Sequence, residues 1–148
     1  MIANIDMAAR HFGMQLQILK VRDGADVERV AAAARAGRAQ ATPRVETTFI
    51  VANRSRIGAL AAREGIPVEG EFTAFGVDDI LLAYGADLGD LLRRAATLVD
   101  RILKGDRPAD MPIERSVKLE LTPNTKVARA LKIMIPTSMR MRADRVVE

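Results

Sequence analysis

The sequence predicts an α/β fold in which a mostly parallel β-sheet is flanked by helices. Short apolar or alternating segments, typical of strands, are separated by segments with the three- and four-residue spacing of amphipathic helices. Strands joined through helices form βαβ units, and these units build parallel sheets. The length of 148 residues suits one ordinary domain, so we expect a single α/β domain over residues 1–148.

The most strongly marked element is an amphipathic helix over residues 88–103. Asp87 is placed to cap its first turn, Gly105 to end it in a left-handed conformation, and Pro108 to prevent its continuation. Its apolar residues recur at steps of three and four and form one continuous stripe: Leu88, Leu91, Leu92, Ala95, Ala96, Val99, Ile102 and Leu103. A stripe of this size must pack on a large surface.

The other expected elements follow from the same periodicities. They are a helix over residues 2–12, a strand over 14–21, a helix over 26–35, a helix over 53–63, strands over 66–72, 80–84 and 113–121, and a helix over 125–132.

Two further segments have mixed strand signals. Pro43 and the charged residues around it make residues 38–51 a poor central strand, which is either an edge strand or has its apolar core confined to residues 49–51. The tail, residues 136–148, alternates arginines with apolar residues, which predicts a half-buried edge strand rather than a nucleic-acid-binding stripe. The alternating residues are Met139, Arg140, Met141, Arg142, Ala143 and Arg145.

The composition excludes several classes of function. The formal net charge of +4 comes mainly from arginines scattered at helical spacing, and aromatic residues make up only 3% of the chain, so we expect no nucleic-acid partner. The absence of cysteine excludes disulfides and thiolate metal sites. No apolar run approaches the roughly 18 residues that span a bilayer.

No catalytic or metal-binding motif is present in the sequence. His11 is the only histidine, and without a second ligand nearby in the sequence a surface or packing role is favoured over catalysis. Asp78 and Asp79 are adjacent and would point apart, which favours a solvated loop over a catalytic carboxylate pair. We therefore expect a non-enzymatic protein with no catalytic residue, metal or cofactor.

The candidate ligand-binding residues lie where the expected strands end. Open α/β sheets bind ligands beyond the carboxyl ends of their strands. For Tyr84, the only tyrosine, a core position is an equally good interpretation. The predicted ligand-binding set is Tyr84, Glu46, Thr47, Thr48, Gly70 and Thr73.

Three segments carry a resemblance to a known family: ANRSRIGALAAREGIPVEGEF, AYGADLGDLLRRAATLVDRILKGDRPADMPIE and KLELTPNTKVARALKIMIPTSMRMRADRVVE. The tyrosine-glycine pair before the long helix, the KGDRPADMP segment after it and the NTKVARALKIMIP segment resemble the substrate-binding proteins of ABC importers. The closest resemblance is to the tryptophan/tyrosine-type group, which has the type I periplasmic-binding fold. The resemblance covers nearly all of residues 1–148. The sequence departs from the family pattern at PRVETT and at Glu69-Gly70, where the family has an aromatic residue before the glycine.

The resemblance implies that the chain corresponds to the C-terminal half of such a protein. These proteins have two α/β lobes joined by three crossings, and a small ligand is held between the lobes. This chain would supply the C-terminal lobe of the Rossmann-like fold, and residues 84–118 would recross toward the N-terminal lobe.

The implied function is that of a truncated solute-binding component of an ABC-type importer. It would bind a small organic solute such as an amino acid, work with ABC permease subunits, and lie in the periplasm or at the cell surface. The sequence does not begin with a basic segment followed by an apolar block, as a signal peptide does, so a cytoplasmic location is expected if residue 1 is the natural start.

In this fold the long helix packs on the lobe that the chain lacks. Its stripe would then be covered by the chain's own sheet, by a second copy or by a separate partner. The alternative function is therefore an interaction module that self-associates through the Leu88–Leu103 face without binding ligand, and a third is a cytoplasmic effector-sensing domain, for which no helix-turn-helix is visible. A homodimer would form through Leu88, Leu91, Leu92, Ala95, Val99 and Ile102.

Overall fold

The computed structural model describes residues 2–75, 79–115 and 118–148 of the chain. The chain divides into two compact units, Met1–Gln40 and Ala41–Glu148. In the described residues, the first unit contains two helices, and the second contains a four-stranded sheet with the remaining helices. None of the helices in the described ranges is long and apolar enough to span a bilayer. The assignment of residues 1–148 to a single domain stays a prediction.

In the first unit, α1 (Ile2–His11) and α2 (Asp26–Ala36) confirm two predicted helices. Asp26 is the first residue of α2. Its carboxylate lies 2.6 Å from Nη2 of Arg29 and accepts a hydrogen bond of 2.9 Å from the backbone N–H of Arg22. These hydrogen bonds, that from Arg29 above all, lower the pKa of Asp26 to about 2. The carboxylate therefore stays ionised and stabilises the first turn of α2.

The predicted strand over residues 14–21 is wrong. The segment is irregular and joins no sheet among the described residues, and two of its apolar positions, Met14 and Ile18, are exposed. Alternation indicates a segment with two different faces, but a strand also needs a neighbouring strand to bond its N–H and C=O groups. The N–H of Met14 instead donates to the carbonyl oxygen of Ala9 and closes the end of α1.

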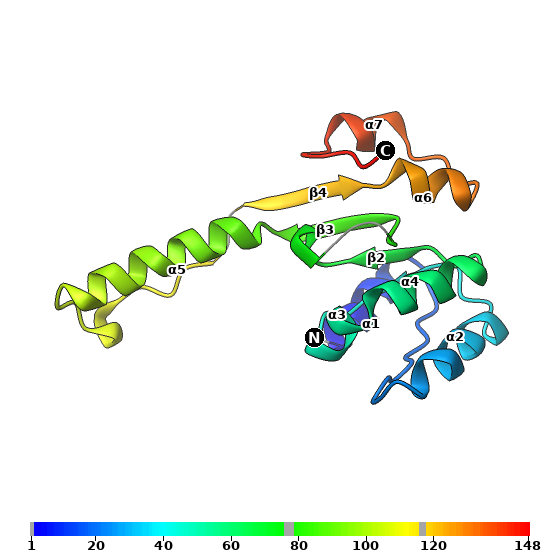
Figure 1. Cartoon of the computed structure of the whole chain (residues 1–148), viewed down its shortest axis with the longest axis horizontal. Helices are drawn as coiled ribbons and strands as arrows, with labels where there is room; N and C mark the ends of the chain where they lie inside the picture. The colour runs from blue at the N-terminus through cyan, green and yellow to red at the C-terminus, as the bar shows by residue number, and fades with distance from the viewer. Residues whose placement is uncertain (1, 76–78, 116–117) are drawn as a thin grey trace. The chain divides into compact units, whose positions relative to one another are not determined.

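The sheet of the second unit has the strand order β1-β2-β3-β4 (Figure 1). β1 (Thr42–Pro43), β2 (Val68–Gly70) and β3 (Leu82–Ala86) are parallel, and β4 (Leu119–Pro123) runs antiparallel to β3. The prediction of a mostly parallel sheet is confirmed. β2 is shorter than the predicted segment 66–72, β3 begins two residues later than the predicted 80–84, and β4 begins later than the predicted 113–121, because only residues with a partner in the ladder belong to a strand.

β1 is an edge strand, which was one of the two alternatives for residues 38–51. Pro43 has no N–H to donate, and it lies in the strand that ends the sheet order. The N–H groups of Thr42 and Arg44, on either side of it, donate to carbonyl oxygens of the β2 segment at 2.9 and 3.0 Å.

The other alternative, a strand over residues 49–51, is wrong. These residues belong to the short helix α3 (Thr48–Ala52). The side-chain oxygen of Thr47 accepts a hydrogen bond of 3.2 Å from the N–H of Ile50 and so caps the first turn. This local cap overrides the strand preference of the apolar residues that follow it.

The core of the second unit lies between α4 and the sheet. α4 (Arg54–Arg63) and α6 (Thr125–Ala130) confirm the helices predicted over residues 53–63 and 125–132. The buried cluster takes one residue from α4 and the others from the sheet and the turn before β3: Ala61, Val68, Ile80 and Ala83. Two short 3-10 helices, η1 (Thr73–Phe75) and η2 (Pro108–Asp110), complete the described elements apart from α5 and α7.

The tail does not form the predicted edge strand. Its residues Thr137–Met141 form the helix α7, and in its described part only Val147 makes a β-bridge, with Asn124. Pro136 favours this helix because its fixed φ suits the start of a helical turn, and its carbonyl oxygen accepts hydrogen bonds from the N–H groups of Met139 and Arg140.

α5 (Leu88–Leu103) has the ends that the sequence predicted. Oδ1 of Asp87 accepts a hydrogen bond of 3.0 Å from the N–H of Asp90, and Gly105 follows the helix with a φ of +109°. The segment after the helix runs back beside it (Figure 1), joined by an ion pair of 2.7 Å between Arg94 and Glu114.

The chain leaves the sheet for α5 and returns to it at one place. The N–H of Asp87 donates to the carbonyl oxygen of Lys118 at 3.0 Å, and Nζ of Lys118 forms an ion pair with the Asp87 carboxylate. The hydrogen bond from Lys118, followed by that from the N–H of Asp90, lowers the pKa of Asp87. Asp87 therefore both caps α5 and joins its start to the start of β4.

The apolar stripe of α5 is not covered by the sheet. No residue of this helix is buried, and the side chains of Leu92 and Leu103 are 63% and 81% exposed. The alternative in which the chain's own sheet covers the stripe is therefore wrong.

Gly85→Ala should destabilise the sheet strongly. A Cβ at this position would lie 1.8 Å from the carbonyl oxygen of Glu71, so the backbone of β3 or of the neighbouring segment would have to shift. We expect a loss of at least about 2 kcal/mol in the free energy of unfolding, measured by urea denaturation. Gly89→Ala, on exposed α5, is the comparison: its Cβ would lie 3.2 Å from Oδ1 of Asp87, and alanine favours a helix, so it should cost far less than Gly85→Ala. An equally small loss for Gly85→Ala would show that β3 and Glu71 are not in contact.

Candidate functional site

The parallel strands end at one edge of the sheet, and an ion pair is buried there. Arg44 follows β1, and its Nη2 lies 2.7 Å from Oε1 of Glu46. The two side chains are only 4% and 3% exposed. Burial of an ion pair removes its hydration at a large cost, so most pairs stay at the surface. This one is therefore a distinctive feature of the sheet edge.

Gly70, the last residue of β2, makes room for the buried pair. A Cβ at this position would lie 3.3 Å from Nη2 of Arg44, 3.6 Å from Oε1 of Glu46 and 2.9 Å from Cδ1 of Ile80. A larger residue would push these side chains away from the strand. The structure thus brings together two of the predicted ligand-binding residues, Glu46 and Gly70.

One oxygen of the pair has no hydrogen-bond partner. Oε2 of Glu46 is buried and accepts no hydrogen bond from any of the residues that the structure describes. A buried acceptor without a donor costs about 1–3 kcal/mol, and native structures hold few of them. A donor group from a ligand would remove this cost.

Three more glutamates surround this edge: Glu69, Glu71 and Glu120. Burial first, and then the charges of Glu71 and Glu46, raise the pKa of Glu69. Glu71 packs against Gly85 of β3, and Glu120 is the partner of Gly85 on β4. We call Glu46, Glu69, Glu71 and Glu120 the acidic edge.

The acidic edge is suited to hydrogen-bond donors that carry positive charge. Its carboxylates outnumber Arg44, which is already paired with Glu46. Carboxylates are acceptors only, and their strongest hydrogen bonds are made with cationic donors such as ammonium groups. In the described ranges, no group of acidic, histidine or cysteine side chains could hold a metal ion.

Three of the remaining predicted residues, Thr73, Thr47 and Thr48, have different places in the structure. The hydroxyl of Thr73 donates a hydrogen bond of 2.6 Å to Oε2 of Glu120, so Thr73 lies beside the acidic edge. Thr47 caps α3, and Thr48 is the first residue of that helix. Their roles in ligand binding stay predictions.

Tyr84 lies on the other face of the sheet. Successive residues of a strand point to opposite faces, and its neighbour Ala83 is completely buried in the core. The side chain of Tyr84 is 51% exposed, so the interpretation as a core ring is wrong. The structure does not bring Tyr84 together with Glu46 and Gly70.

Sequence reasoning missed Arg44, Glu69, Glu71 and Glu120 as site residues. The sequence does contain a signal for two of them, because Glu69 and Glu71 flank Gly70 at the end of a strand, where few charged residues are expected. No local signal indicates that Glu120 reaches the same edge, since its position depends on the pairing of β4 with β3.

His11 and Asp79 lie apart from the acidic edge's glutamates in their contacts. His11 is exposed at the end of α1, and its ring contacts that of Phe12 edge to face at 5.0 Å. Asp78 lies outside the described residues, and Asp79 packs closely against Gly58 of α4.

Comparison with known proteins gives one family. Residues 2–147 match the model of the family described as ABC transporter substrate binding protein. None of the curated proteins matches the chain.

Three solved structures share the fold. A conserved domain protein from Vibrio cholerae O1 biovar El Tor has a TM-score of 0.89 at 20% identity, covering 98% of this chain and 49% of that one. The ABC domain from Streptococcus pneumoniae in complex with L-Trp has a TM-score of 0.87 at 20% identity, covering 99% and 50%. The ligand-free, open structure of CD0873, a substrate-binding protein with adhesive properties from Clostridium difficile, has a TM-score of 0.71 at 16% identity, covering 99% and 48%. This chain therefore spans about half the length of the solved structures that it matches.

Removal of one partner of the buried pair should be costly. Arg44→Met leaves the Glu46 carboxylate without its counterion, and we expect it to lower the free energy of unfolding by about 3–5 kcal/mol. Arg44→Met combined with Glu46→Leu should recover most of this loss, because apolar groups then replace the pair. Urea denaturation measures both, with the exposed Arg54→Met as the control. A loss for Arg44→Met as small as the control's would contradict the burial of the pair.

Proposed function

This chain belongs to the family of ABC transporter substrate-binding proteins, and from this premise we propose that it forms one wall of a binding site for a small organic solute. Its fold is that of one lobe of a type I periplasmic-binding protein. Proteins of this family take part in transport by binding a solute rather than by catalysing a reaction, so the proposed role is non-enzymatic.

The observation that carries the proposal is the unpaired oxygen of Glu46 at the ends of the parallel strands. Ligands of open α/β sheets bind at this edge. An ammonium group would donate to Oε2 of Glu46 and would also be attracted by Glu71 and Glu120. Every amino acid carries such a group, which supports an amino acid as the solute.

One of the neighbours with the same fold was solved in complex with L-Trp, which supports the same class of ligand. A flat aromatic side chain would need a wide apolar surface beside the ammonium site. Tyr84 stays a predicted ligand contact, and its side chain points to the face of the sheet opposite to Gly70, whose partner is Ala83. We therefore propose an amino acid without assigning its side chain.

The second wall of the site would come from an N-terminal lobe. The chain spans about half the length of the matched structures, and the apolar stripe of α5 is exposed as if to meet another surface. In this proposal residues 1–148 form one α/β domain, and residues 84–118 recross toward the other lobe. The partners would be ABC permease subunits, and the place of action would be outside the cytoplasm.

The test is titration of the ¹⁵N-labelled chain with individual amino acids. We expect one or a few of them to shift the amide signals of Gly70 and Gly85 with saturation. Glu120→Gln should weaken this binding about tenfold, because it removes a charged acceptor but still accepts from Thr73. Glu114→Gln, on the segment after α5, is the matched control. The proposal fails if no amino acid shifts these signals, or if both variants weaken binding equally.

A second candidate is self-association through α5, favoured by the exposure of its apolar stripe. The six residues predicted for a homodimer lie on this helix, and Leu92 and Val99 among them are more than half exposed. Two copies could cover each other's stripes, as exposed apolar surfaces of this extent usually mark an interface.

Sedimentation at increasing concentration tests this candidate. If the stripe joins two copies, Leu92→Ser combined with Val99→Ser should convert a dimer into a monomer, whereas Arg93→Ser, an exposed position between them, should not. A wild-type chain that stays monomeric at the highest attainable concentration would exclude the dimer, and the solute-binding proposal would be unaffected.

A further inference from the structure

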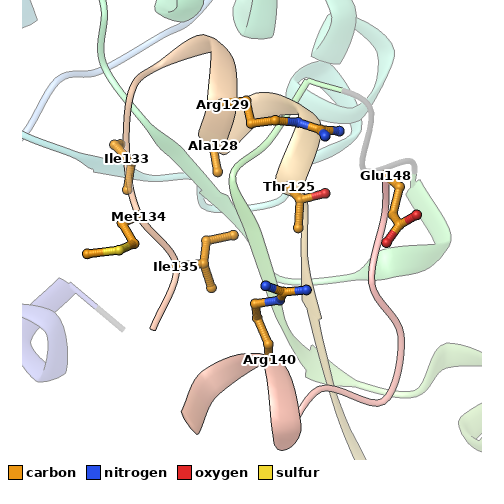
Figure 2. Close-up of a pocket in the computed structure, with 8 residues that line it drawn as sticks. All are labelled: Thr125, Ala128, Arg129, Ile133, Met134, Ile135, Arg140 and Glu148. Carbon is orange, nitrogen blue, oxygen red and sulfur yellow. The ribbon is translucent and has the colours of Figure 1, made fainter. Parts of the chain in front are cut away.

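A second hollow lies between α6 and α7, away from the acidic edge. Figure 2 shows this pocket, which has a volume of about 280 Å³. Pro123, just before α6, pairs with the first residue of β3, Leu82, whereas Glu120 of the acidic edge pairs near the other end of β3. The pocket and the acidic edge therefore lie toward opposite ends of the sheet and share no residue.

Two arginines without partners line this pocket. Arg129 comes from α6 and Arg140 from α7 (Figure 2), and the guanidinium group of neither forms an ion pair or hydrogen bond with any described residue. Elsewhere in the second unit, arginines are commonly paired with a carboxylate oxygen at 2.7 Å. Two unpaired guanidinium groups on one hollow attract an anion, and their planar donors match a carboxylate.

The wall of the pocket beside these arginines is apolar. It is formed by the segment between α6 and α7, of which Figure 2 shows Ile135 lying toward Arg140 and the side chain of Met134 pointing away from the arginines. Ile133, which also lines the pocket, is 36% exposed, so part of this apolar surface faces solvent. A ligand with a short hydrocarbon tail would cover it and remove that surface from water.

Glu148 restricts the charge of the ligand. Its carboxylate also lines the pocket, and it would repel a dianion more strongly than a monoanion. A single carboxylate group is therefore favoured over a phosphate or sulfate dianion. A pocket of this volume suits a small ligand.

We propose that this pocket binds a small aliphatic monocarboxylate. The carboxylate group lies between Arg129 and Arg140, and the hydrocarbon tail lies on Ile133 and Ile135. The site is separate from the solute site at the acidic edge, and it does not depend on the function proposed for that edge.

The test uses hexanoate as the probe on the full chain, followed by the amide signals of Ala128 and Ile135. We expect saturable shifts with a dissociation constant on the order of 1 mM, as for a small ligand in an open pocket. Arg140→Gln should weaken binding about tenfold, since it removes a charged donor. Arg142→Gln is the matched control, because Arg142 lies two residues after Arg140 and does not line the pocket. Glu120→Gln should leave hexanoate binding unchanged.

Two comparison probes separate this site from simpler explanations. Hexylamine has a similar tail and the opposite charge, and sulfate has the charge without the tail. Hexanoate should bind at least about tenfold more tightly than either, because only it satisfies both parts of the pocket. Equal binding of sulfate, equal binding of hexylamine, an equal effect of Arg140→Gln and Arg142→Gln, or no saturable shift with hexanoate would each overturn the proposal.

Discussion

The hydrogen bonding of β3 to a strand on each side is the constraint on which the second unit depends. β3 pairs in parallel with β2 and antiparallel with β4, and Ala83 within it is completely buried. The parallel pairing aligns the strand ends that carry the acidic edge, and the antiparallel pairing carries the chain to α6 at the opposite end. β3 also leads through Asp87 directly into α5. One strand of five residues therefore sets the positions of the acidic edge, the pocket and the long helix.

The fold could be predicted from the sequence where the signals were local. The cap, the stripe and the stop of α5 all lie within one short stretch, so Asp87 and Gly105 marked its ends correctly. The strand over residues 14–21 and the tail strand over residues 136–148 could not be judged in this way. Alternation describes one segment, whereas a strand exists only beside a partner: residues 14–21 join no described sheet, and the tail is helical over Thr137–Met141 and reaches the sheet only at the single bridge of Val147.

The candidate site was predicted in part, for a related reason. Glu46 and Gly70 followed from the rule that strand ends gather at one edge, and the structure places them together. Glu120 could not be foreseen, because its position depends on the register of β4 against β3. Tyr84 stays a prediction as a ligand-binding residue; it follows Ala83, the partner of Gly70, and therefore points to the opposite face of the sheet. A chain of net positive charge thus carries a concentrated negative edge that its overall composition conceals.

The junction of Asp87 with Lys118 has a consequence for how this lobe can be altered. α5 and the described segment after it form an arm whose start is joined to the start of β4 at this one junction. The entropy of closing such an arm grows slowly with its length, so lengthening or shortening it costs the strand pairings little. The junction of Asp87 with Lys118 is thus a suitable site for grafting, at which a different helix can replace α5 while the sheet keeps its register.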